Sequence, residues 1–88
     1  MSALFEQAKN IVGGDRRDDY GPLRESFERI AMVWSGILKA HVTTEQVALC
    51  MIGVKIVREA NKHKDDNVVD LYGYTLCYER LTGQPYTP

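Results

Sequence analysis

The sequence has almost no excess of charge and no long uninterrupted hydrophobic run. Its 88 residues include 11 Lys or Arg and 12 Asp or Glu, which gives a formal net charge of −1. This balance argues against a broad nucleic-acid surface or a surface for acidic membranes. The longest apolar run, about a dozen residues, contains Lys55 and is too short to cross a bilayer. No basic start followed by an apolar core is present, so we expect no export signal and no membrane association.

Cysteine is also scarce. Cys50 and Cys77 both fall within helical patterns, and their spacing is not that of metal ligands. Two reduced core thiols in a cytosolic protein are therefore favoured over a disulfide. We accordingly expect the protein to act in the cytoplasm, without a metal or another cofactor.

Strand-like alternation is absent over any useful length, and helical periodicity replaces it. The pattern predicts an all-α, four-helix domain spanning residues 1–82, with a flexible C-terminal tail at 83–88. The expected helices cover residues 3–12, 23–41, 44–61 and 68–82. Thr43 and Gln46 have the spacing of a capping box at the third helix start, and Asp66 or Asn67 is expected to cap the fourth.

The central helix is the most apolar part of the chain. Residues 47–57 are apolar or glycine apart from Lys55, so no solvent-facing side can be drawn on them. A helix that is hydrophobic all round is a buried helix, covered by other helices or by a second copy. Gly53 in its interior suggests close packing of another backbone. We therefore predict a buried central helix and a homodimer, or a higher even oligomer.

Lys55 must snorkel, find a carboxylate or serve a ligand, because it lies within this apolar run. Asp70 lies in an apolar stretch of the fourth helix, so a Lys55–Asp70 contact between the two helices is physically attractive. Two interpretations remain open: a structural ion pair, or an anion-binding pocket floored by Lys55 and Arg58.

A charged loop at residues 15–22 offers a second set of candidates. A solvated loop whose charges neutralise each other is favoured there, and the alternative is a loop that presents arginines and a tyrosine to an anion. Together with the central pair, the candidate ligand-binding residues are Asp15, Arg16, Tyr20, Arg24, Lys55, Arg58, His63, Lys64, Asp70 and Tyr74. No residue is assigned a catalytic or metal-binding role.

Metal-dependent hydrolysis is disfavoured. All-α nucleotide pyrophosphohydrolases need carboxylates at E-x-x-E and E-x-x-D spacing on two helices to hold magnesium. Here Glu45 and Glu59 are fourteen residues apart, and Asp70 and Glu79 are nine apart. The sequence leans against an enzyme without deciding the question.

Several short motifs together resemble a known group of proteins. They are Gly14-Asp15-Arg16, Tyr20-Gly21-Pro22, Glu25 with Phe27, Arg29-Ile30-Ala31, Trp34-Ser35, Val42-Thr43, Val47-Ala48 with Met51, Lys55-Ile56 with Arg58, His63-Lys64-Asp65, Asp70 and Gly73-Tyr74. From about residue 9 to residue 81, the chain resembles a phage- and prophage-encoded helical family of unknown function. That family is distantly similar to MazG-like and nucleotide-modification-associated domains. The resemblance implies a phage protein acting in the host cytoplasm near nucleotide metabolism, and it implies no established reaction.

Three functions follow as hypotheses. The leading one is a phage protein that binds a nucleotide or other phosphorylated ligand without metal-dependent hydrolysis. The second is an interaction protein that binds a host protein through the apolar helix and the tyrosines of the fourth helix. The third is a divergent MazG-like nucleotide pyrophosphohydrolase.

Overall fold

The computed structural model describes residues 2–12 and 22–83, and within those ranges the chain forms α-helices and no strand. The helices are α1 (Ala3–Asn10), α3 (Leu23–Leu38), α4 (Thr44–Asn61) and α5 (Asp65–Thr82). The predicted all-α class is confirmed over the described residues, where four helices lie close to the expected ranges. None of the helices in the described ranges is both long and apolar enough to cross a membrane.

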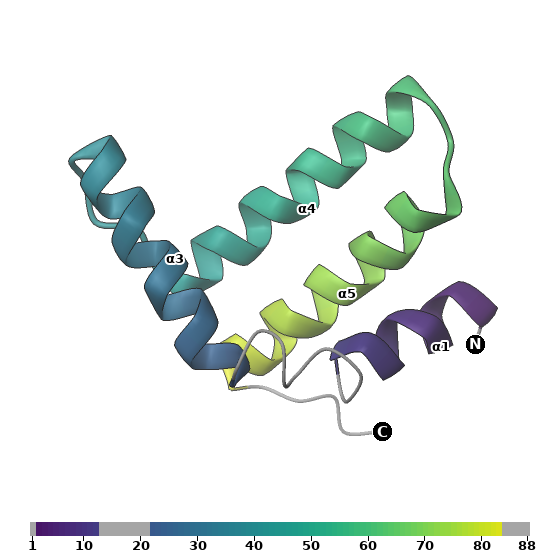
Figure 1. Cartoon of the computed structure of the whole chain (residues 1–88), viewed down its shortest axis with the longest axis horizontal. Coiled ribbons are helices and arrows are strands. Elements are labelled where there is room, and N and C mark those ends of the chain that lie inside the picture. The colour runs from purple at the N-terminus through teal and green to yellow at the C-terminus, as the bar shows by residue number, and fades with distance from the viewer. Residues whose placement is uncertain (1, 13–21, 84–88) are drawn as a thin grey trace.

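Helices α4 and α5 form an antiparallel hairpin joined by residues 62–64 (Figure 1). Helix α1 packs along α5, so the first and last helices of the chain lie side by side. Helix α3 contacts α4 near the start of α4, and the two helices then diverge. The arrangement therefore places α5 between α4 and α1, with α3 standing across one end.

The core lies where α3, α4 and α5 meet. Its buried members come from all three helices: Phe27, Ala31, Val47, Ala48, Cys77 and Leu81. Trp34 and Met51 are only partly buried and pack against this cluster. Val47 and Ala48 are fully enclosed, so the beginning of α4 is its best-buried part.

The start of α4 follows the predicted capping box. The Thr43 hydroxyl accepts a hydrogen bond from the Gln46 backbone N–H at 3.1 Å. The Gln46 side-chain carbonyl in turn accepts from the Thr43 N–H at 2.9 Å. These two bonds satisfy N–H groups that have no partner within the helix, which is why the start could be predicted from local sequence.

Two helix ends differ from the prediction. Helix α5 begins three residues early, at Asp65, because Lys64 takes the capping position and Asp65 and Asp66 place negative charge in the first turn. Asn67 is not a cap and is buried instead. Helix α3 ends at Leu38 rather than near residue 41, where Lys39 adopts a left-handed conformation with φ 54°.

The prediction that the central helix is buried on all sides is wrong for the single chain. Only Val47 and Ala48 of α4 are buried, whereas Leu49, Ile56 and Val57 are exposed. The reason is geometric, because α5 covers one side of α4, α3 covers one end, and no described helix of the same chain lies on the opposite side. Periodicity alone reports that a side is apolar, and it does not report what covers that side.

Candidate functional site

Lys55 and Asp70 form an ion pair that bridges α4 and α5, as the sequence predicted. The Lys55 Nζ lies 2.9 Å from Asp70 Oδ2. The two side chains differ in burial, since that of Lys55 is 12% exposed and that of Asp70 is 43% exposed. Lys55 lies two turns after Ala48 and one turn after Met51, on the side of α4 that faces α5. Its stem therefore runs along apolar surface and brings the ammonium to the carboxylate.

A small cavity lies between α1 and α5, beside this pair. Its volume is about 190 Å³, and its lining residues are Ala8, Ile11, Val12, Val69, Asp70, Gly73, Tyr74 and Cys77. Most of the wall is apolar, while Asp70 contributes a carboxylate and Tyr74 a phenol. A side-chain carbon at Gly73 would meet Val12 at 3.7 Å, which is ordinary packing distance. The ion pair and the cavity thus share Asp70.

The thiol of Cys77, in the wall of the cavity, is kept protonated by its burial. Burial raises the pKa of the Cys77 thiol to about 11, with Arg80 acting weakly in the opposite direction. The thiol is therefore protonated at neutral pH and is a poor nucleophile. The expectation of two core thiols holds for Cys77 and is wrong for Cys50, which is exposed.

His63 does not face the Lys55–Asp70 pair and instead lies between two carboxylates. Its Nδ1 contacts a Glu59 carboxylate oxygen, and its Nε2 lies 3.3 Å from Asp65 Oδ1. Glu59 also accepts hydrogen bonds from the Lys64 backbone N–H at 3.0 Å and from Asn67 Nδ2 at 3.3 Å. Glu59 therefore organises the turn between α4 and α5, and the predicted role of His63 in closing an anion pocket is not supported by these contacts.

The same contacts predict how stability depends on pH. The hydrogen bond with Glu59 and its charge raise the pKa of His63 above 6.5. The hydrogen bonds from His63 and Lys64 lower the pKa of Glu59 below 4.5. The His63 contribution is present below pH 6.5 and is lost as the pH rises through its raised pKa. The Glu59 contribution is present above pH 4.5 and is lost as the pH falls through its lowered pKa.

We therefore expect this turn to be most stable between about pH 4.5 and 6.5. Urea unfolding at pH 5.5 and pH 8 measures the difference in the free energy of unfolding. The variant His63→Gln has no imidazole, so its free energy of unfolding should change less between pH 5.5 and pH 8 than that of the unmodified protein. An unchanged difference in the variant would show that His63 does not contribute to the pH dependence.

Arg24 lies at the other end of α5. Its guanidinium Nη2 donates a hydrogen bond to the Leu81 carbonyl at 2.9 Å, where a cation stabilises the helix C-terminus. Leu81 is eleven residues beyond Asp70, so the Arg24 and Lys55 head groups are separated by roughly 16 Å along α5. The role of Arg24 in closing a site around Lys55 stays a prediction, and in this structure its side chain is bound at the C-terminal end of α5.

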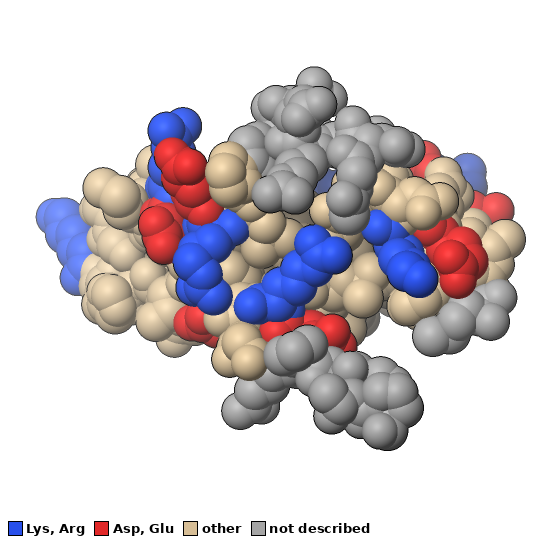
Figure 2. Space-filling view, turned by 90° about the horizontal axis from the view of Figure 1, so that it is seen from below, with Lys and Arg blue, Asp and Glu red and all other residues tan. Residues whose placement is uncertain are grey.

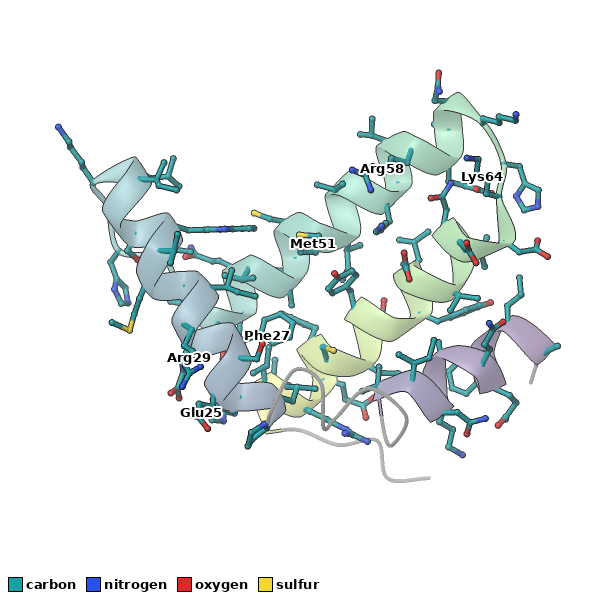
Figure 3. All side chains as sticks on the ribbon, viewed as in Figure 1. Glu25, Phe27, Arg29, Met51, Arg58 and Lys64 are labelled. Atoms are coloured by element: carbon teal, nitrogen blue, oxygen red, sulfur yellow. The ribbon has the colours of Figure 1, made fainter. Side chains whose placement is uncertain are left out.

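Arg58 and Lys64 lie towards the α4–α5 turn, far from Glu25 and Arg29 at the start of α3 (Figure 3). Arg58 is exposed and follows Lys55 by three residues, so the two share a side of α4. Tyr74 follows Asp70 by one turn and lies on the cavity wall. Asp15, Arg16 and Tyr20 lie outside the described residues. Of the ten candidates, the described fold thus groups Lys55, Arg58, Asp70 and Tyr74.

Charges of both signs are interspersed on the face of the molecule shown in Figure 2, where basic and acidic side chains lie close together. Over residues 2–12 and 22–83, no three His, Cys, Asp or Glu side chains converge as metal ligands would.

Two parts of the site were missed by sequence reasoning. The first is the contribution of α1 to the cavity through Ala8, Ile11 and Val12, since nothing local indicates which helix α1 packs on. The second is the role of Glu59, which the i, i+4 spacing of Glu59 and His63 could have revealed.

Comparison with known proteins identifies the family. A family model described as a domain of unknown function, DUF6378, matches residues 3–82. The chain is 34% identical over 84 residues to the Gene 55 protein of Mycobacterium phage D29, covering 94% of this chain and 56% of that protein. It is 37% identical over 81 residues to the Gene 55 protein of Mycobacterium phage L5, covering 90% of this chain and 52% of that protein. The chain thus spans about half the length of these curated relatives.

No solved structure matches the chain. The family model covers nearly all of the sequence, and both relatives are phage proteins. The chain therefore belongs to the DUF6378 family of phage proteins of unknown function.

Proposed function

We propose that the chain binds a nucleotide or other phosphorylated ligand, without hydrolysing it, in the cytoplasm of the host cell. The observation that carries the proposal is the Lys55–Asp70 pair, whose carboxylate partner lines the α1–α5 cavity. A mostly apolar hollow with a few convergent polar groups is the usual form of a small-molecule site.

The size of the cavity limits which part of a ligand it can hold. Its volume of about 190 Å³ is below the range of about 300–1,000 Å³ typical of pockets that enclose a whole drug-sized ligand. We therefore expect only the base to enter, with its face against apolar side chains and Tyr74. Asp70 remains 43% exposed and can accept a hydrogen bond from a ligand hydroxyl or amino group.

The phosphate is expected to lie outside the cavity, on the α4 side. Arg58 is exposed one turn beyond Lys55 and can bind a phosphate with two parallel hydrogen bonds. Lys55 is neutralised by Asp70 in the free protein, so a phosphate must compete with that carboxylate for its ammonium. The proposal therefore predicts that the ion pair loosens when ligand binds.

Calorimetry and thermal shift with nucleoside mono-, di- and triphosphates test the proposal. We expect at least one nucleotide to raise the melting temperature and Lys55→Ala to weaken its binding tenfold or more. Gly73→Leu, which places a side chain in the cavity, should do the same. Arg29→Ala removes a cation at the far end of the molecule and should leave binding unchanged.

The same measurements can contradict the proposal. An absence of any nucleotide-dependent shift in the unmodified protein would exclude nucleotide binding. Binding that survives both Lys55→Ala and Gly73→Leu would place the ligand elsewhere. Release of phosphate or pyrophosphate from a nucleotide in the presence of magnesium would favour MazG-like hydrolysis over simple binding. The similarity to MazG-like domains stays a prediction.

A further inference from the structure

The side of α4 that faces away from α5 is apolar along its length. We define the outer face of α4 as Leu49, Cys50, Gly53, Ile56, Val57 and Ala60, all of which are exposed. Positions 49, 53, 56 and 60 recur every three or four residues, as in the contact seam of a coiled coil. The opposite side of the same helix already packs against the core through Val47, Ala48 and Met51. The outer face is thus a second apolar side with no covering from the described residues.

Gly53 stands in the middle of this face, and no described residue lies close enough to require a glycine there. A side-chain carbon built at Gly53 would meet nothing within 4 Å. Glycine is unfavourable in an exposed helix interior, where alanine keeps the same shape at less entropic cost. A glycine at such a position does allow another helix backbone to approach closely. Among the described residues nothing contacts this position, so Gly53 leaves room for another helix backbone to approach the outer face closely.

The outer face is nearly symmetric about Gly53. Leu49 and Cys50 precede it by four and three residues, and Ile56 and Val57 follow it by three and four. In an antiparallel crossing with a two-fold axis at Gly53, Leu49 and Cys50 of one copy lie against Val57 and Ile56 of the other. Such a two-fold contact uses the same patch on both subunits. Antiparallel helices also oppose their dipoles favourably.

We propose that the outer face of α4 is the self-association surface of this protein, and that it packs antiparallel against the same face of a second copy. The net charge of −1 leaves little electrostatic repulsion between the two copies. The proposal concerns a different surface from the ligand cavity and does not depend on nucleotide binding.

The available apolar area fits a dimer when α3 is included. Met32, Val33, Ile37 and Leu38 of α3 are all more than half exposed, and α3 diverges from α4 beyond their contact (Figure 1). When the α4 helix of a second copy packs antiparallel, its C-terminal half lies beside the N-terminal half of the first α4. That N-terminal half also contacts α3, so the second copy comes close to the exposed residues of α3. Leu49, Cys50, Ile56 and Val57 of α4 with Val33, Ile37 and Leu38 of α3 offer, at on the order of 100 Å² each, on the order of 700 Å² per copy, which is close to one partner's share of a standard interface.

Light scattering coupled to size exclusion tests the proposal with the whole chain. We expect the unmodified protein to have a dimer mass at 100 µM and the double variant Ile56→Lys, Val57→Lys to have a monomer mass. Thr75→Lys, an exposed change on α5, should remain a dimer. Far-UV circular dichroism checks that each variant is folded. A monomer mass for the unmodified protein would overturn the proposal. The same holds if the protein is a monomer by itself and associates only with a different protein.

Disulfide cross-linking tests the orientation without a disruptive charge. In a Cys50→Ser background, Gly53→Cys should form a linked dimer on mild oxidation, because Gly53 lies on the two-fold axis. A mixture of Leu49→Cys and Val57→Cys proteins should link as a heterodimer, whereas Leu49→Cys alone should not, since its two copies lie about 12 Å apart along the axis. Thr75→Cys should stay unlinked. Efficient linking of Leu49→Cys alone, or no linking of Gly53→Cys, would overturn the antiparallel arrangement.

Discussion

Replacing Phe27 with alanine is expected to lower the free energy of unfolding by about 3–5 kcal/mol, the range for deletion of a buried aromatic side chain. Phe27 is 7% exposed and belongs to the cluster where α3, α4 and α5 meet. Its side chain points from α3 towards the end of α5 (Figure 3). A domain of this length has a total stability of about 4–13 kcal/mol. The loss is therefore a large share of the stability available to a domain of this size.

Urea unfolding followed by circular dichroism measures this loss. Glu28→Ala is the control, because Glu28 follows Phe27 on the exposed side of α3 and its removal should change stability by less than about 0.5 kcal/mol. A loss below about 1 kcal/mol for Phe27→Ala would mean that the three-helix junction contributes little to stability.

Removing Asp70 is expected to destabilise the protein more than removing Lys55. In Asp70→Ala, the ammonium of Lys55 loses its carboxylate while it remains 12% exposed, which should cost about 1–3 kcal/mol. In Lys55→Met, the carboxylate of Asp70 stays 43% exposed to water, so the cost should be below about 1 kcal/mol. The asymmetry follows from the different burial of the two charges.

The double variant Lys55→Met, Asp70→Ala gives the decisive comparison. It should be more stable than Asp70→Ala alone, because the second change removes the charge that lost its partner. The double-mutant cycle from urea unfolding should give a coupling energy of about 1 kcal/mol or more. Additive effects, or a double variant less stable than Asp70→Ala, would show that the pair does not act as a unit.

Features fixed by neighbouring residues were predictable from the sequence. The capping box at Thr43 and Gln46 depends on two hydrogen bonds within four residues, and it formed as expected. The Lys55–Asp70 contact was also predictable, because each charge lies in an apolar stretch of one of two consecutive helices joined by a short turn. In that arrangement few other partners are within reach.

Features fixed by the path of the chain were not predictable. Arg24 was predicted to help close a pocket at Lys55, but α3 crosses the far end of α5, where Arg24 donates to the Leu81 carbonyl. The outer face of α4 was expected to be buried because it is apolar, and no helix in residues 2–12 and 22–83 covers it. His63 was predicted to help close a ligand pocket, but in the fold its two ring nitrogens face Glu59 and Asp65.

The packing of α1 on α5 has a consequence for the order in which the protein folds. The α4–α5 hairpin forms by closing a turn of only three residues, 62–64, whereas Ala8 of α1 must meet residues of α5 about 60 positions later in the chain. Closing the longer loop costs more chain entropy, so α1 should dock after the hairpin has formed and detach before it unfolds. Because α1 forms one wall of the cavity, its docking would also create the hollow beside Asp70.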